Sequence, residues 1–316
     1  IDIHFLGVGV VTSLRFSEKV LVEKAILAGY LEFAKYLAVE AGDTALNYFR
    51  VQHDEIGLAN KSLNAFDPVT KADKEIETKL RSLISERYPE HGIFGEEEGY
   101  LEGNGLTWVI DPIDGTRAYM SGLLHWGILV ALFDGTRPIL GVMYQPYTSE
   151  LFFGDGNFSY ISVRGEKPKL LKSSSIKSFS DTVFATDTLE VLSGHERSVA
   201  ERSRLVRLGG DCYVFSMLAM GLIHVVFEKG LKPYDIQALI PIIEYFRQPS
   251  YRIIPNICIA SKGRVQSILL FSQKPLSQCN TVGLDSSSRT SQVLVKILLA
   301  EYWKIHPEFV DLSLIH

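Results

Sequence analysis

The chain has 316 residues, of which 46% are hydrophobic and 22% charged, a length sufficient for one large domain or two medium ones. Its 32 Lys and Arg against 37 Asp and Glu give a formal net charge of −5. This balance excludes a protein that binds nucleic acid through charge alone, because such proteins carry a basic surplus. Three scattered cysteines make no disulfide framework and predict a reducing compartment, which we expect to be the cytoplasm.

At the N-terminal end we expect a leader followed by two helices. The leader, residues 1–22, has no assigned role, because its apolar part lacks the basic segment and cleavage site of a signal peptide and is too short to span a bilayer. Apolar residues at three- and four-residue steps predict a long helix over 22–49 and a second helix over 70–86. No segment approaches 18 uninterrupted apolar residues, so we expect no membrane partner.

Short apolar runs bounded by Gly, Pro, Asp and Asn come next, as is typical of strands. They cover residues 106–110, 127–133, 139–144 and 150–153. The polar and basic segment 167–180 is the expected subdomain boundary. Beyond it the pattern predicts a strand at 183–185, a helix at 211–222, a strand at 224–228 and a helix at 235–246. This order indicates a layered fold of mixed α and β structure.

Acidic residues at the ends of these elements indicate a metal site. They are Glu96 and Glu97 after a short apolar pair, Asp111 and Asp114 after the strand at 106–110, and Asp235 at the start of a predicted helix. Magnesium takes oxygen ligands and keeps several waters for its substrate. Pro112 and Gly115 favour a tight turn around the two aspartates. If these carboxylates converge, their mutual repulsion requires a cation.

Each motif alone has a simpler interpretation. Three glutamates between two glycines are typical of a solvated loop, and Asp-Pro and Asp-Gly are common turn dipeptides. Asp235 is well placed as a helix N-cap, and Thr70 with Asp73 fits a capping box that needs no catalysis. Considered together, the motifs favour the metal site.

The same strings resemble, in order and spacing, the signatures of the inositol monophosphatase family of Mg²⁺-dependent phosphatases. They are Asp67-Pro68-Val69-Thr70-Lys71-Ala72-Asp73, Gly95-Glu96-Glu97, Asp111-Pro112-Ile113-Asp114-Gly115-Thr116 and Tyr234-Asp235, where the family usually has Trp-Asp. The match covers about residues 23–244 and implies the α+β fold of that family, a layered α-β-α-β-α sandwich. Within the family, the segments 209–213 and 230–241 are most similar to the histidinol-phosphate phosphatase branch.

The resemblance implies a role for each residue of these strings. Two or three Mg²⁺ ions would be held by Glu96, Asp111, the Ile113 carbonyl, Asp114 and Asp235. The catalytic residues would be Thr116, Asp73 and Glu96, which activate the attacking water. The substrate would contact Gly115, Thr116, Asp211, Cys212, Glu228 and Asp235. Acidic groups at 211 and 228 suit an amine or imidazolium, and Cys212 is interpreted as a small buried residue rather than a nucleophile.

The function that the resemblance implies is hydrolysis of a small phosphate ester, histidinol phosphate to histidinol and phosphate, as in histidine biosynthesis. Two alternatives stay open: an inositol-1-monophosphatase, and a non-catalytic family member that acts as a binding protein. The family also implies a homodimer.

The end of the chain departs from the family. The expected organisation is the leader 1–22, an N-terminal α+β subdomain over 23–170 and a C-terminal α/β subdomain over 171–316. Residues 247–316 carry a net charge of +4 against −9 for residues 1–246, and they lack the Gly-rich turn and Trp-x-Gly element that the family has there. A strand at 267–271 and a helix at 291–303 are still expected. Real divergence and a reading-frame or chain-tracing error near residue 245 are both open hypotheses.

Overall fold

A computed structural model describes residues 24–52, 59–60, 68–174, 178–243, 281–285, 299 and 308–312. The chain divides into two compact units, of which the first contains residues 16–255 and the second residues 256–316. All the predicted site residues belong to the first unit. None of the helices in the described ranges is long and apolar enough to cross a membrane.

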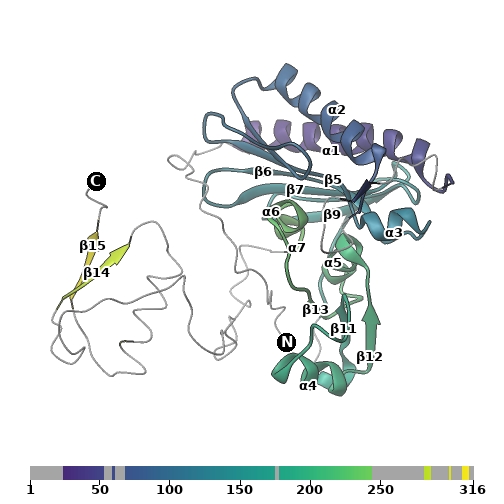
Figure 1. Ribbon diagram of the computed structural model, residues 1–316, viewed down its shortest axis with the longest axis vertical. Coiled ribbons are helices and arrows are strands. Elements are labelled where there is room, and N and C mark those ends of the chain that lie inside the picture. The colour runs from purple at the N-terminus through teal and green to yellow at the C-terminus, as the bar shows by residue number, and fades with distance from the viewer. Residues whose placement is uncertain are drawn as a thin grey trace. The chain divides into compact units, whose positions relative to one another are not determined.

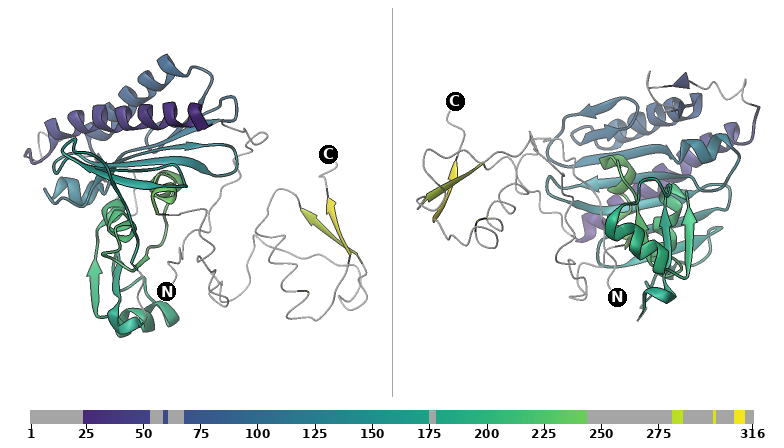
Figure 2. Two further views of the ribbon diagram at one scale, coloured as in Figure 1. Left: turned by 180° about the vertical axis from the view of Figure 1, so that it is seen from behind. Right: turned by 60° about the horizontal axis from the view of Figure 1, so that its bottom comes forward.

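Two long helices form the outermost layer of the first unit. They are α1 (Lys24–Tyr48) and α2 (Lys71–Arg87), which lie side by side on one face of a large sheet (Figures 1 and 2). At the start of α2, the Thr70 N–H donates to the Asp73 carboxylate at 2.8 Å and the Asp73 N–H donates to the Thr70 hydroxyl at 3.4 Å. This capping box satisfies N–H groups that have no partner inside the helix. Both predicted helices are confirmed.

The second layer is an eight-stranded sheet with the order β10-β9-β8-β7-β6-β5-β3-β4. Its strands are β3 (Gly92–Gly95), β4 (Gly99–Leu101), β5 (Thr107–Asp114), β6 (Gly127–Phe133), β7 (Pro138–Gln145), β8 (Glu150–Gly154), β9 (Ser159–Val163) and β10 (Lys169–Leu170). Neighbouring strands run antiparallel, except that β3 and β5 run parallel. A separate short pair, β1 (Ala59–Asn60) and β2 (Pro68–Val69), precedes α2.

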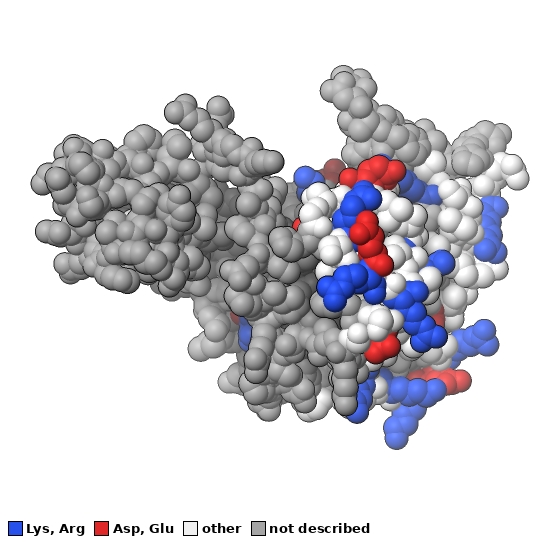
Figure 3. Space-filling model, turned by 90° about the horizontal axis from the view of Figure 1, so that it is seen from below, with Lys and Arg blue, Asp and Glu red and all other residues white. Residues whose placement is uncertain are grey.

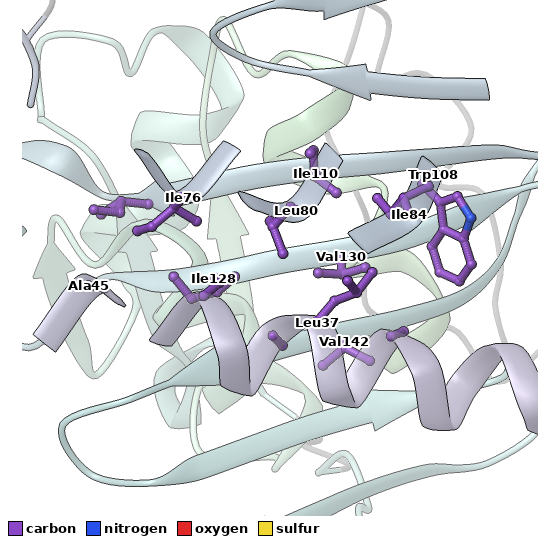
Figure 4. Close-up of a cluster of buried hydrophobic side chains, with 14 of the residues drawn as sticks. Leu37, Ala45, Ile76, Leu80, Ile84, Trp108, Ile110, Ile128, Val130 and Val142 are labelled. Carbon is purple, nitrogen blue, oxygen red and sulfur yellow. The ribbon is translucent and has the colours of Figure 1, made fainter. Parts of the chain in front are cut away.

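A continuous apolar core joins the two helices to the sheet. Leu37 of α1, Leu80 of α2 and Val130 of β6 meet in its centre, and Trp108 closes one end (Figure 4). All four side chains are fully buried. Full burial of a side chain of this size contributes about 1.5–3 kcal/mol to stability, so this core fixes α2 firmly on the sheet.

The opposite face of the sheet carries a second helical layer, then a smaller sheet and a last helix (Figure 1). The elements are α3 (Thr116–Met120), a short 3₁₀ turn (Phe179–Asp181), β11 (Val183–Thr186), α4 (Gly194–Arg202), β12 (Leu205–Leu208), α5 (Asp211–Ala219), β13 (Val225–Phe227), α6 (Pro233–Ile236) and α7 (Ile240–Ile243). Helix α5 contacts both β7 and β13, and the parallel sheet has the order β12-β11-β13. Basic and acidic side chains are interspersed on the underside of this region (Figure 3). The predicted five-layer sandwich is confirmed.

Two predicted elements differ from the structure. The predicted helix at 235–246 is wrong: two short helices, α6 and α7, stand there. Pro241 explains the break, because it has no N–H to donate and its ring would clash with the carbonyl four residues earlier in a continuous helix. The strand predicted to end at Ile110 continues to Asp114, with a register shift between Asp111 and Asp114.

The second unit contains one described pair of parallel strands. These are β14 (Thr281–Asp285) and β15 (Glu308–Leu312). Parallel neighbours require a long crossover connection rather than a tight turn. The leader 1–22, the strand expected at 267–271 and most of the helix expected at 291–303 lie outside the described residues.

Candidate metal and substrate site

Three carboxylates from two elements converge beside the end of β5. Asp111 and Asp114 belong to β5, and Asp235 is the third residue of α6, which contacts β5. One carboxylate oxygen from each of the three lies within 4.8 Å of the others. We call Asp111, Asp114 and Asp235 the metal cluster. Oxygen atoms at this spacing are the donor set that a hard divalent cation takes, so the residues fit the predicted Mg²⁺.

Local backbone geometry directs each carboxylate of the metal cluster. The Ile113 N–H donates to Asp111 Oδ1 at 3.1 Å across the register shift, and the Cys212 N–H donates to Asp114 Oδ2 at 2.6 Å. The Lys232 N–H donates to Asp235 Oδ2 at 2.5 Å. Asp235 is therefore not the N-cap of its helix, because Lys232 occupies that position.

The electrostatics of the metal cluster favour a proton or a bound cation over bare carboxylates. Burial raises the pKa of Asp111 well above its usual value, and the negative charges of Glu96, Asp114 and Asp235 raise it further. Burial also raises the pKa of Asp114 well above its usual value, and the charges of Asp211 and Asp235 raise it further. A bound cation would remove both causes, since it replaces lost solvation and compensates the repulsion.

Gly115 and Thr116 lie directly after the metal cluster. Gly115 has φ of 86°, and a Cβ at this position would come within 2.5 Å of the His125 carbonyl oxygen, so only glycine fits. It precedes α3, where the Thr116 hydroxyl donates to the Ile113 carbonyl at 3.1 Å. The predicted roles of Thr116 as a catalytic residue and of the Ile113 carbonyl as a metal ligand remain predictions.

Asp73 is almost fully buried in the first turn of α2. Burial raises the pKa of Asp73 to about 7, and the charges of Glu97 and Glu96 add to this increase. The hydrogen bonds from Thr70 act in the opposite direction and lower the pKa. Its Oδ2 accepts hydrogen bonds from Thr70, whereas its buried Oδ1 has no hydrogen-bond partner among the described residues. Asp73 therefore serves the capping box and still offers one free oxygen and a titratable proton near neutral pH.

A cavity of about 280 Å³ opens next to the metal cluster. Its lining includes eight of the predicted site residues, namely Glu96, Asp114, Gly115, Thr116, Asp211, Cys212, Glu228 and Asp235. Asp73, Asp111 and Ile113 are not part of this lining and are buried. The structure thus gathers most of the predicted residues around one space.

Asp187, which is not among the predicted site residues, also lines this cavity. It follows the last residue of β11, as Glu228 follows the last residue of β13, and these strands pair in parallel with Thr186 opposite Phe227. The two carboxylates therefore leave neighbouring strands at the same edge. The signal that could have found Asp187 is the one that identified Asp111, an acidic residue directly after a buried apolar strand.

Asp187, Asp211 and Glu228 form what we call the acidic rim of the cavity. Burial raises the pKa of Glu228 to about 8, and the charges of Asp187, Asp211 and Asp235 contribute to the same increase. Burial and the Asp187 charge raise the pKa of Asp211 to about 6, while Arg117 opposes them. The acidic rim therefore favours a cationic ligand.

The start of α5 connects the acidic rim to the metal cluster. Asp211 has φ of 45°, a left-handed conformation that costs energy for a residue with a side chain. This turn directs the Cys212 N–H to Asp114 while Asp211 faces the cavity. Burial raises the pKa of the Cys212 thiol well above its usual value, and the negative charge of Asp114 adds to this. A thiol that stays protonated is a poor nucleophile.

Comparisons with known proteins find relatives in sequence and in fold. A model of the inositol monophosphatase family matches residues 27–245, and a model described as menaquinone biosynthesis matches residues 232–315. A histidinol-phosphatase from Chlorobaculum parvum is 34% identical over 68% of this chain and 82% of that protein. The chloroplastic bifunctional phosphatase IMPL2 from Arabidopsis thaliana is 33% identical over 66% of this chain and 60% of its own length. A solved inositol monophosphatase from Zymomonas mobilis superimposes with a TM-score of 0.57 at 33% identity, over 68% of this chain and 82% of that one.

Proposed function

Because the chain belongs to the inositol monophosphatase family, a family of metal-dependent phosphatases, we propose that it hydrolyses histidinol phosphate to histidinol and phosphate. The observation that carries this proposal is one cavity that adjoins the metal cluster and is also lined by the acidic rim. With cations bound at the metal cluster, this lining would suit a phosphate monoester with a cationic alcohol portion, because the phosphate would face the cations and the alcohol portion would face the carboxylates.

Asp111, Asp114 and Asp235, together with Glu96 and the Ile113 carbonyl, would hold two or three Mg²⁺ ions. When bound, Mg²⁺ neutralises charge on the phosphate, stabilises the attacking and leaving oxygens and lowers the pKa of water. Phosphoryl transfer of this kind depends mainly on positioning and charge stabilisation, so a covalent intermediate with the protein is not required.

The chain's own residues would position water and phosphate. With a pKa of about 7, Asp73 is partly ionised at neutral pH, and its free Oδ1 is suited to accept a proton. Thr116 would orient the water through its hydroxyl, and the backbone amides of Gly115 and Thr116 would bind phosphate oxygens. Gly115 allows this close approach because it has no side chain.

The acidic rim would bind the alcohol portion. Histidinol carries an amine and an imidazole, and ionised Asp187, Asp211 and Glu228 would accept hydrogen bonds from their charged forms. Inositol has only neutral hydroxyl groups and would not compensate the negative charge of the acidic rim. The acidic rim therefore favours histidinol phosphate over inositol phosphate as the substrate.

Inositol-1-monophosphatase activity is the second candidate, supported by the similarity to the Zymomonas mobilis enzyme. A non-catalytic binding protein is disfavoured because every proposed ligand side chain is present. From the family resemblance we also propose a homodimer, which size-exclusion chromatography with light scattering tests. The three scattered cysteines support a location in the cytoplasm.

A substrate panel with and without Mg²⁺ tests the function. We expect phosphate release from histidinol phosphate that depends on Mg²⁺ and stops when EDTA is added, and a much lower kcat/KM for inositol 1-phosphate. Faster turnover of inositol 1-phosphate would replace the substrate assignment with the second candidate. Binding of histidinol phosphate without hydrolysis would favour the non-catalytic alternative.

A further inference from the structure

The loop that carries Glu96 is anchored from α2. This loop, residues 95–99, connects β3 to β4, and its Glu96 lines the cavity. Glu77 of α2 accepts the backbone N–H of Glu97 at 2.7 Å with Oε2 and that of Glu98 at 2.9 Å with Oε1. One side chain thus fixes the two peptide groups that directly follow Glu96.

Glu77 is a buried charge whose partner, Arg81, is partly exposed. The Glu77 side chain is fully buried, and the Arg81 guanidinium lies 2.8 Å from its Oε1. Arg81 also donates to the Gly99 carbonyl at 2.5 Å, so the pair holds the three residues 97–99 that follow Glu96. A Cβ on Gly95 would come within 2.1 Å of Glu77 Oε1, which shows how closely the carboxylate approaches the backbone.

Glu77 and Arg81 lie on the same face of α2 as Asp73, the candidate catalytic residue. Asp73, Glu77 and Arg81 follow one another at four-residue steps and therefore lie along one face of the helix. Asp73 and Glu77 are both buried. Since the apolar core fixes α2 on the sheet, this face is a rigid reference for the loop that carries Glu96.

We propose that Glu77, held by Arg81, is a positioning residue that fixes the Glu96 loop and thereby sets the affinity of the metal site. The proposal rests on the part of the proposed function that makes this a cation site, and it does not depend on the substrate. Glu77 acts through the backbone of the loop, as outer partners of metal ligands do elsewhere.

A purely structural role is the competing explanation. A buried ion pair can simply join α2 to the loop, and its loss then lowers thermal stability. Such a role predicts a lower melting temperature with an unchanged dissociation constant for the metal in the folded protein. A positioning role predicts a weaker metal site in protein that is still folded.

The test is calorimetric titration of Mg²⁺ into the metal-free full-length protein, with circular dichroism melts on the same samples. Glu77→Gln keeps the shape, but its amide nitrogen cannot accept an N–H or pair with Arg81. We expect its dissociation constant for Mg²⁺ to rise by about 10- to 100-fold at temperatures where it is folded. Lys79→Met is the matched control, because Lys79 lies on the same helix but bonds to Glu40 and Thr44 of α1 rather than to the loop. Its dissociation constant should match that of the wild type.

Arg81→Lys is the milder second variant, for use if Glu77→Gln does not fold. It keeps the positive charge but loses the planar fork that reaches both Glu77 and Gly99. We expect a smaller increase in the dissociation constant, with the KM for substrate unchanged at saturating Mg²⁺. An unchanged affinity for Mg²⁺ in a folded variant would overturn the proposal. Failure to hydrolyse histidinol phosphate would overturn the substrate assignment alone, because the titration contains no substrate.

Discussion

The metal cluster and the acidic rim adjoin one cavity and are built in different ways. Two members of the metal cluster lie three residues apart on β5, and the third is held against that strand by α6. The members of the acidic rim come from three separate elements, after β11, at the start of α5 and after β13. Strand β5 fixes Asp111 and Asp114 relative to each other, so neither position can move alone. Each residue of the acidic rim belongs to a different element, so one position can change without the others. We therefore expect the chemistry to depend on the metal cluster and the choice of substrate to depend on the acidic rim.

The largest effect is expected from Asp111→Asn in the metal cluster. The variant removes a buried charge that a cation needs, so kcat/KM for histidinol phosphate should fall by more than the ~10- to 100-fold typical of losing an outer partner of a ligand. Steady-state phosphate release measures this loss. Glu166→Gln, on the exposed loop between β9 and β10, is the control and should be as active as the wild type. Wild-type activity in Asp111→Asn would refute the metal mechanism.

Glu228→Gln in the acidic rim should change the substrate preference while leaving the chemistry intact. A hydrogen bond to a charged group contributes about 1.5–3 kcal/mol, so KM for histidinol phosphate should rise by about 10-fold or more. The kcat value should stay close to that of the wild type. The measurement is kcat and KM for histidinol phosphate and inositol 1-phosphate in parallel. An equal loss for both substrates would contradict a role in recognising the cation.

The pH dependence of KM should also come from the acidic rim. The pKa values of Asp211 and Glu228 are raised to about 6 and about 8, so both carboxyls keep their protons at higher pH than usual. A protonated carboxyl does not attract an ammonium group, and KM for histidinol phosphate should therefore decrease as the pH rises from 6 to 8. The Glu228→Gln variant should lose the upper part of this change. An identical pH profile in the variant would assign the titration to another group.

A smaller effect is expected from Asp187→Asn. Asp187 is exposed, unlike the half-buried Glu228, and exposed charge pairs contribute only about 0.2–1 kcal/mol. KM for histidinol phosphate should rise by a few-fold at most, and less at high salt because the interaction is screened. A series of KM measurements at increasing ionic strength tests this. A loss as large as that of Glu228→Gln would mean that Asp187 contacts the substrate more closely than its exposure indicates.

The difference between the two groups also explains what the sequence predicted. Asp111 and Asp114 were identified because they stand together with Pro112 and Gly115, whose backbone preferences mark the turn. Asp187 was missed because its relation to Glu228 comes from the pairing of β11 with β13, which is not local in the sequence. Glu77 was missed for a similar reason: in the sequence it is an ordinary residue of an amphipathic helix. Strand β12 was missed because its exposed Leu205 and Leu208 do not alternate with polar residues as strand patterns do.

Residues 247–316 form the second contrast within the chain. The model described as menaquinone biosynthesis matches residues 232–315 and so crosses the boundary near residue 245. A segment translated in the wrong reading frame does not keep the residue pattern of a protein family. Peptide mass mapping tests the two hypotheses: real divergence predicts peptides from this segment at their expected masses. Their absence would favour the reading-frame error.

The smallest effect on activity is expected from removing residues 256–316. Every described residue that lines the cavity lies between Glu96 and Asp235, and the match to the inositol monophosphatase family ends at residue 245. A chain that ends at Pro255, the last residue of the first unit, should therefore keep the kcat and KM of the full-length protein within the error of the assay. Circular dichroism of the shortened chain provides the control for folding. A folded chain that has lost activity would show that residues 256–316 contribute to the site, and the division of the chain into an enzymatic part and a separate C-terminal part would be wrong.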